Sequence, residues 1–333
     1  MQHKKERSSM RNQFSFFVKG VCTLGILFSG QIPVFAAELF TDPQFTRGFE
    51  VHNPAPGKHV KRGLIQPYPA TADPAWVLAQ WSCRTSLHTA KPEFLPDGSI
   101  RYADSSKAVT FSPLSNNTRR ITFSLNGIAE YQGRLRDPKE PWIHLLTEQP
   151  IATHPSFLQL AELRFQIRCR LTRAESGLAH DQAKPWHAAQ FLAYLTLQDR
   201  NRQSPHFGDF IWLGVPIYDS RYRQPKPHTA PDTALHKFIY NPPGSVYTTN
   251  SLHDGQWVAI DHDLLPLMRE ALASARQHGF LVQSKDADLQ LGSLNLGWEI
   301  PGLWNVTMEF EGLSLQGRME DATRTKDNGS PDR

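Results

Sequence analysis

The sequence predicts an all-β protein, an antiparallel β-sandwich with one amphipathic helix. Residues 79 to 315 contain many short segments in which apolar and polar residues alternate, which is the period of half-buried strands. Turn signals such as Pro96-Asp97-Gly98 and Asp254-Gly255 separate these segments. A parallel sheet requires strands that alternate with helices along the sequence, and this sequence shows no such alternation. The strands are therefore expected to pair antiparallel.

The clearest strand lies within residues 160–171. From Leu163 to Leu171 the odd-numbered residues are apolar, and the even-numbered residues are Arg164, Gln166, Arg168 and Arg170. A helix would scatter the apolar residues around its circumference, whereas a strand places them on one face. Further strands are expected at 79–87, 109–112, 121–126, 142–146, 190–198, 210–218, 237–240, 257–260, 289–300 and 304–315.

One segment has a helical period. Apolar residues recur at helical spacing through residues 263–277, and Gly279 is a natural stop. Asp261 or Asp263 is the expected N-cap, and Pro266 fits a first turn. We expect this helix to pack over one end of the sandwich.

The amino-terminal residues predict a cleaved secretory signal. Basic residues precede an apolar run from Phe14 to Phe35. A membrane-spanning helix needs about 20 apolar residues, and Lys19, Gly30 and Pro33 leave a shorter run. Cleavage is expected near Ala36, which predicts a secreted or periplasmic protein without stable membrane insertion.

The basic leader accounts for the net charge of the chain. Without its five Lys and Arg and its one Glu, the 36 basic and 32 acidic residues become 31 of each. Nucleic-acid binding depends on a basic surface that displaces counterions from phosphates. The balanced charge therefore gives no reason to expect nucleic acid as a partner.

The composition divides the chain into four parts. Residues 1–36 are the signal, and residues 37–74, rich in Pro, Gly, His and Lys, are expected to form an extended arm across the domain surface. Residues 75–316 form the sandwich, and the charged residues 317–333 are expected to be disordered. Cys83 and Cys169 remain after cleavage, and the sequence leaves open a disulfide or two buried thiols.

Four segments carry a resemblance to a known kind of β-sandwich. They are the alternating segments 160–171 and 190–198, and the closing segments 289–300 and 304–315 around Pro301-Gly302. In these features residues 75–316 are similar to the lectin-like or jelly-roll β-sandwiches of secreted bacterial glycan-binding and glycan-degrading proteins. The similarity is one of architecture, without a shared motif. It implies a fold, and a fold alone does not decide function.

If strands 160–171, 190–198 and 304–315 share one sheet, their polar faces form one surface. We expect that surface to bind a polysaccharide or oligosaccharide, because Arg and Gln bond hydroxyls and Tyr offers an apolar plate with a polar tip. The ligand-binding candidates are Arg164, Gln166, Arg168, Tyr194, Glu299 and Glu309, with Asp219 and Arg221 at the end of another strand. The alternatives are a solvated face on which Arg and Glu pair across strands, and a turn fixed by Asp219 and Arg221.

Two other functions stay open. A polysaccharide lyase or glycoside hydrolase would use the same face, with Glu309 and Glu311 as paired carboxylates or Tyr194 as a base beside Arg168 and Gln166. No catalytic residue is assigned. A non-catalytic envelope protein would instead have this face covered by its arm.

No cofactor and no metal site is expected. The fourteen His show no metal-ligand spacing. Asp261-His262-Asp263 and Asp286-Ala287-Asp288 offer oxygen ligands for Ca²⁺, but capping and turn roles explain them more simply.

Overall fold

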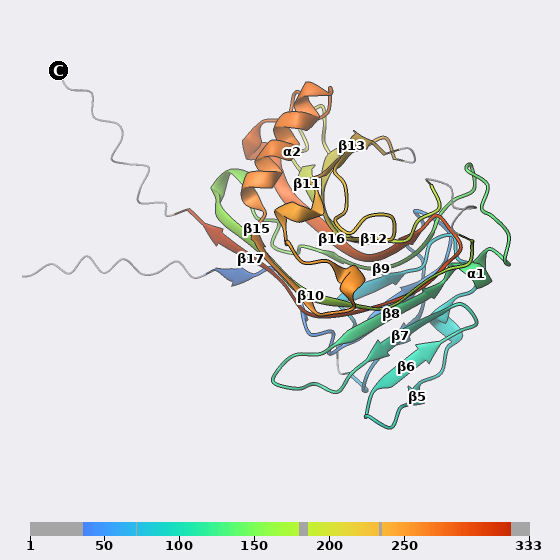
Figure 1. Ribbon diagram of the computed structural model, residues 1–333. Helices are drawn as coiled ribbons and strands as arrows, with labels where there is room; N and C mark the ends of the chain where they lie inside the picture. Colours follow the sequence, from blue (N-terminus) through green and yellow to red (C-terminus); the bar gives the residue numbers. More distant parts are fainter. Residues whose placement is uncertain (1–35, 71, 180–185, 233–234, 321–333) are drawn as a thin grey trace, which may run out of the picture. The chain divides into compact units, whose positions relative to one another are not determined.

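A computed structural model describes residues 36–70, 72–179, 186–232 and 235–320, and it confirms the all-β sandwich. Two sheets lie in layers, with β5 to β8 below and β9, β12 and β16 above in the view of Figure 1. The helices are α1 (Gly127–Glu130) and α2 (Leu265–Gln277), with 3-10 turns η1 (Leu87–Thr89), η2 (Phe157–Gln159), η4 (Gly244–Val246), η5 (Leu252–Asp254) and η6 (Asp286–Asp288).

The first layer, sheet A, has the strand order β15-β10-β17-β8-β7-β6-β5, and β1 also pairs with β17. Its strands are β1 (Ala37–Glu38), β5 (Glu93–Phe94), β6 (Ile100–Ala103), β7 (Lys107–Phe111), β8 (Ile121–Asn126), β10 (Leu160–Ser176), β15 (Val258–Asp263) and β17 (Trp304–Met319). The strong alternation of residues 160–171 thus lies on an interior strand of this sheet.

The second layer, sheet B, has the strand order β13-β14-β12-β11-β16-β9-β4-β2-β3. Its strands are β2 (Phe49–His52), β3 (Lys61–Ile65), β4 (Trp76–Ala79), β9 (Ile143–Pro150), β11 (Gln190–Asp199), β12 (Phe210–Asp219), β13 (His228–Pro231), β14 (Phe238–Asn241) and β16 (Leu289–Ile300). Most pairs are antiparallel as expected, and the exceptions are β2 with β4 and β12 with β14.

The core lies between the inner faces of the two sheets. Phe191 of sheet B packs its ring 6.0 Å from that of Phe310 in sheet A, and both side chains are fully buried. The indole N–H of Trp298 in β16 donates to the carbonyl of Phe123 in β8, at 3.0 Å. Buried aromatic side chains of both sheets therefore hold the two layers together. A binding site would have to lie on the outward face of one sheet.

The predicted arm is wrong as a surface segment. Residues 37–74 contribute β1, β2 and β3, and Phe45, Phe49 and Val51 are among the fully buried core residues. Their strands have only two to five residues, too short for the alternation to stand out in the sequence. The expected disorder is also wrong for residues 317–319, because β17 continues to Met319.

The predicted helix is confirmed as α2, which contacts β10 of sheet A and β12 and β14 of sheet B. Pro266 lies in its first turn, as expected. The N-cap residue is Leu264, and the carboxylate of Asp263 accepts the N–H of Leu265 at 3.0 Å from one residue earlier. Asp261 does not cap the helix, because its carboxylate bonds to Arg164.

Cys83 and Cys169 are buried free thiols rather than a disulfide. Burial raises the pKa of the Cys83 thiol to about 12 and also raises the pKa of Cys169. None of the helices in the described part of the chain has the length and apolar character that crossing a bilayer requires. Residues 1–35 of the expected leader, and most of the expected tail, lie outside the described residues.

Candidate functional site

The premise of a single polar surface is wrong. Strands β10 and β17 are neighbours in sheet A, but β11, which carries Tyr194, belongs to sheet B. Alternation determines which side chains of a strand point to the core, and it does not determine which sheet the strand joins. The two sets of outward side chains therefore lie on opposite outer faces of the sandwich, and Tyr194 cannot act beside Arg168 and Gln166.

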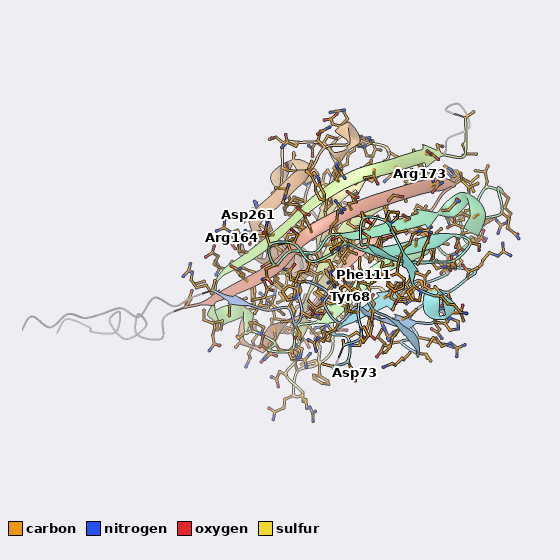
Figure 2. The ribbon with its side chains drawn as sticks, turned by 90° about the horizontal axis from the view of Figure 1, so that it is seen from below. Tyr68, Asp73, Phe111, Arg164, Arg173 and Asp261 are labelled. Carbon is orange, nitrogen blue, oxygen red and sulfur yellow. The ribbon has the colours of Figure 1, made fainter. Side chains whose placement is uncertain are left out.

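The outer face of sheet A consists of paired charges. The Arg164 guanidinium lies 2.6 Å from the Asp261 carboxylate, and Gln166 donates to the same carboxylate at 3.0 Å. Figure 2 shows Arg164 and Asp261 side by side at one end of β10, with Arg173 toward its other end. Further pairs are Arg168 with Glu311, Arg170 with Glu309, Arg120 with Glu309, and Arg318 with Glu162. We call these paired side chains on the outer face of sheet A the arginine ladder. Its charged groups already have partners on neighbouring strands.

A tryptophan extends this ladder. The guanidinium carbons of Arg168 and Arg170 lie 5.2 and 5.1 Å from the ring centre of Trp257. The cation–π contacts occupy the ring on that side. Glu309 and Glu311, the carboxylate pair considered for hydrolysis, are each held by arginine.

Asp219 and Arg221 fix the turn that follows β12. Asp219 is 3% exposed, and its carboxylate accepts the backbone N–H of Arg221 at 2.9 Å and the guanidinium at 2.9 and 2.6 Å. Gln190 donates to the same carboxylate at 3.0 Å. Such a bidentate pair with a backbone bond is a local clamp, and it sits at the edge of the sheet B outer face.

A row of polar side chains crosses the middle of the sheet B outer face. Strand pairing places Glu148 of β9 opposite Asn295 of β16, and Asn295 opposite Tyr194 of β11. Tyr194 lies opposite Gly214 of β12, beyond which comes Asn241 of β14. We call Glu148, Asn295, Tyr194 and Asn241 the central polar row.

Gly214 permits the row to continue across β12. A Cβ atom at this position would lie 2.0 Å from Asn241 Oδ1 and 2.9 Å from the Tyr194 ring. The Asn241 amide instead reaches across and donates to the Tyr194 hydroxyl at 3.1 Å. Any side chain at position 214 would separate the two groups.

A second row lies four residues along the strands, about 13 Å away at 3.3 Å per residue. It contains His144 of β9, Glu299 of β16 and Gln190 of β11, followed by Asp219 of β12. We call it the Glu299 row. Between the rows Leu146 and Leu192 flank Gly297, and both side chains are buried, so apolar residues separate the two polar rows.

Glu148 and Glu299 are the unusual carboxyls of this face. Burial raises the pKa of each to about 7, and the negative charge of Asp232 adds to the effect on Glu299. The only ion-pair partner found for Glu148 in the described residues is His59, at 3.8 Å. For Glu299 no hydrogen bond or ion pair forms with any described residue. Each carboxyl therefore carries a proton for much of the time at neutral pH.

Several polar atoms on this face are buried without a partner in the described residues. They are Oδ1 of Asn295, Oδ1 of Asn241 and the indole Nε1 of Trp81. Buried polar atoms are almost always hydrogen-bonded, because leaving one unpaired costs on the order of 1–3 kcal/mol. Such a concentration indicates that water or a ligand supplies the missing hydrogen bonds.

Aromatic rings continue the face toward one end. The Tyr194 ring lies 6.2 Å from that of Trp212, and Trp212 lies 4.8 Å from Phe210. Trp212 and Phe210 pair with Thr196 and Gln198 of β11, so they share the outward face with Tyr194. Their partly buried rings make an apolar strip beside the central polar row, and the Trp212 and Phe210 rings stand nearly perpendicular to each other, at 82°.

Metal binding has no support in the described part of the chain, where no three His, Cys, Asp or Glu side chains converge on one point. Asp261 is bonded to Arg164, and Asp288 accepts from Asn201 at 3.0 Å.

Comparison with solved structures finds several glycoside hydrolases of low similarity. The endoglucanase cel12A from Rhodothermus marinus is 10% identical, with a TM-score of 0.38, covering 69% of this chain and 97% of the enzyme. A family 12 xyloglucanase from Bacillus licheniformis is 7% identical over 69% and 97%, also with a TM-score of 0.38. The xyloglucanase domain of NopAA from Sinorhizobium fredii, in complex with cellobiose, is 12% identical over 70% and 100%, with a TM-score of 0.34.

No protein-family model matches the sequence, and no curated protein is similar to it. Similarities of the size found among solved structures do not determine a function. A function for this chain has to be inferred from its own side chains.

Sequence reasoning found part of this site. Glu299 and Tyr194 were binding candidates, and the structure places both on this face. Glu148, Asn241, Asn295 and Trp212 were not among the candidates. The alternation of residues 143–148 was the available signal for Glu148. It puts Ile143, Leu145 and Thr147 on one face of the strand, and His144, Leu146 and Glu148 on the other.

Proposed function

We propose that this protein binds a neutral polysaccharide or oligosaccharide on the outer face of sheet B. The central polar row carries the proposal, because Asn295 and Asn241 hold buried amide oxygens without partners beside the tyrosine and tryptophan rings. Sugar hydroxyls would supply the missing hydrogen bonds, and the apolar face of a sugar ring would pack on the aromatic strip. A secreted or periplasmic location, expected from the leader, would bring the protein to such glycans.

The charges on this face favour a neutral glycan over an acidic one. Glu148 and Glu299 lie on it, and the charge of Asp232 acts on Glu299. Two cations of this face are engaged, since Lys237 bonds to Asp209 and Arg221 to Asp219, and the Arg200 guanidinium donates to Gln198 at one end. A uronate carboxylate between the two polar rows would meet negative potential.

Replacing Trp212 by Ala is expected to weaken glycan binding by about tenfold or more, because one aromatic platform is lost. The measurement is calorimetric titration of the mature protein with neutral gluco-, xylo- and manno-oligosaccharides. The matched control is Trp257→Ala, which removes a partly buried tryptophan from the sheet A face. Binding by the control should equal that of the wild type.

The opposite pattern would move the site to sheet A. If Trp257→Ala or Arg168→Ala weakened binding while Trp212→Ala did not, the arginine ladder with Arg164, Gln166, Arg168 and Glu309 would be the ligand surface. Absence of binding to every neutral and acidic glycan tested would refute glycan recognition on either face.

Glycoside hydrolysis is a second candidate, favoured by the state of Glu299. A carboxyl with a pKa of about 7 and no partner in the described residues can donate a proton to a leaving group near neutral pH. Asp219 lies in the same row two strands away, about 10 Å between Cα atoms at 4.8 Å per strand. The two carboxyls of a glycosidase lie about 5 to 9.5 Å apart, but the Asp219 carboxylate is held by Arg221, so no second carboxyl is assigned.

If hydrolysis occurs, Glu299→Gln is expected to lower the rate of reducing-end formation by about a hundredfold or more, because the amide cannot donate an acidic proton. Oligosaccharide binding by the variant should remain close to that of the wild type. Equal reducing-end release by Glu299→Gln and the wild type would exclude Glu299 as the acid. No release by the wild type leaves binding as the function.

A further inference from the structure

A small cavity lies where the aromatic strip ends. Its volume is about 160 Å³, and it forms between the loop after β11, the start of β12, the residues just before β14, and the turn after α2. The lining residues are His206, Asp209, Phe210, His236, Lys237, Gly279, Phe280 and Leu281. Phe210 belongs both to the cavity and to the outward face of sheet B.

The aromatic strip leads from the central polar row into this cavity. Tyr194, Trp212 and Phe210 follow one another with ring centres 6.2 and 4.8 Å apart. From Gln190 to Gln198 the same face extends over eight residues of β11, about 26 Å at 3.3 Å per residue. A chain of several sugar rings on this face would therefore have one end at Phe210.

The polar groups of the cavity include a ring nitrogen without a partner in the described residues. His206 Nδ1 lies 3.1 Å from the Asp209 carboxylate, which also accepts from the Lys237 ammonium. A carboxylate only accepts, so Nδ1 carries the hydrogen of this bond, and Nε2 is left for another hydrogen bond. This Nε2 is buried and has no partner in the described residues. A ligand hydroxyl, which can both donate and accept, would satisfy it.

The remaining lining suits a polyhydroxylated ring. Burial alone would raise the pKa of Asp209, but hydrogen bonds from Lys237 and His206 outweigh it and lower the pKa, so the group is an anion at neutral pH. An anionic ligand would meet this charge, whereas hydroxyls can donate to the carboxylate and accept from the ammonium. Phe210 and Phe280 supply apolar surface, and Lys237 lies 5.6 Å from the Phe210 ring centre.

The volume sets the size of the ligand. The cavity measures about 160 Å³. It is below the 300 to 1,000 Å³, roughly, of pockets that enclose drug-sized ligands. One sugar ring matches this space, and a continuing chain does not.

We propose that this cavity binds the terminal residue of the glycan that lies on sheet B, so that the protein recognises chain ends. The inference rests on the proposed glycan binding and adds a subsite to it. His206 Nε2 forms a hydrogen bond with a hydroxyl of the terminal ring, Asp209 accepts from one, Lys237 donates to one, and Phe210 packs against the ring. A glycan with a free end then binds more tightly than one whose ends are blocked.

The test uses the neutral oligosaccharides described above, each in a free form and in forms blocked by methylation or conjugation at either end. We expect blocking of one end to weaken wild-type binding by about tenfold, because one or two hydrogen bonds with charged or polar groups are lost. His206→Ala should weaken binding of the free form to a similar extent and remove the discrimination between free and blocked ends. His88→Ala, which changes an exposed histidine elsewhere, should bind like the wild type.

Three results would overturn the inference. Equal binding of free and blocked ends, with no effect of His206→Ala, would leave an internal-chain binder and spare the proposed function. A second result would be that free and end-blocked oligosaccharides bind equally, while inorganic phosphate binds saturably and His206→Ala abolishes phosphate binding. This result would assign the cavity to an anion. Failure of the wild type to bind any glycan would remove both proposals. Circular dichroism and melting of His206→Ala establish that the variant is folded.

Discussion

Replacing Lys107 by Met is expected to lower the free energy of unfolding by about 3 to 5 kcal/mol, the cost of leaving buried charges unpaired. The Lys107 side chain has no exposed surface, and its ammonium lies 2.9 Å from Asp104 and 3.4 Å from Glu130. It also donates to the Thr85 carbonyl at 2.8 Å. Urea unfolding at neutral pH measures the change.

Two further variants make this prediction specific. Lys61→Met removes an exposed lysine that pairs with Glu50 at 2.8 Å, and it should cost less than about 1 kcal/mol. Adding Glu130→Gln to Lys107→Met should recover part of the loss, because a buried charge is then removed with its partner. A loss below 1 kcal/mol for Lys107→Met would contradict a tightly packed ionic cluster at this position.

The second large effect is a dependence of stability on pH caused by Glu148 and Glu299. Each has a native pKa of about 7 against an ordinary value of 4.5, so the folded protein holds the two protons more tightly than the unfolded chain does. Stability from these groups is complete below pH 4.5 and is lost as the pH rises to about 7. At 1.36 kcal/mol per pKa unit the loss approaches about 3 kcal/mol for each group, and contact with solvent reduces it.

Difference measurements isolate this effect. Burial lowers the pKa of His144 to about 4, which adds stability as the pH rises from 4 to 6.5 and opposes the glutamates. We therefore compare Glu299→Gln and Glu148→Gln with the wild type at each pH. Each variant should match the wild type near pH 4.5 and be more stable by about 2 to 3 kcal/mol at pH 8. A constant difference across this range would show that the carboxyls titrate normally.

The fold was predictable where the strands are long. Residues 289–300 and 121–126 match β16 and β8, because apolar side chains alternate along both, with one interruption at Gly292-Ser293 of β16. Residues 80–87, by contrast, leave the strand after Ala79 and turn, and Gln80 is buried with hydrogen bonds to the carbonyl of His52 and the N–H of Leu87. Such contacts between distant segments leave no periodic signal in the sequence.

The candidate site was predictable only one strand at a time. Alternation placed Asn295 and Glu299 together on β16, since the two residues are an even number of positions apart. It gave no information on the neighbours of β16, so Tyr194 was grouped with arginines of the other sheet. The opening at Gly214 and the approach of Asn241 depend on the pairing of β12 with β14, a parallel contact that the sequence does not announce.

The most direct test of the central claim is an NMR titration of the tryptophan indole N–H signals with an oligosaccharide that binds. Single Trp→Phe variants assign the signals of Trp212 and Trp257, which lie on opposite outer faces. The account predicts that saturating ligand shifts the Trp212 signal and leaves that of Trp257 unchanged. A shift of Trp257 with an unchanged Trp212 would contradict it and place the ligand on the arginine ladder of sheet A.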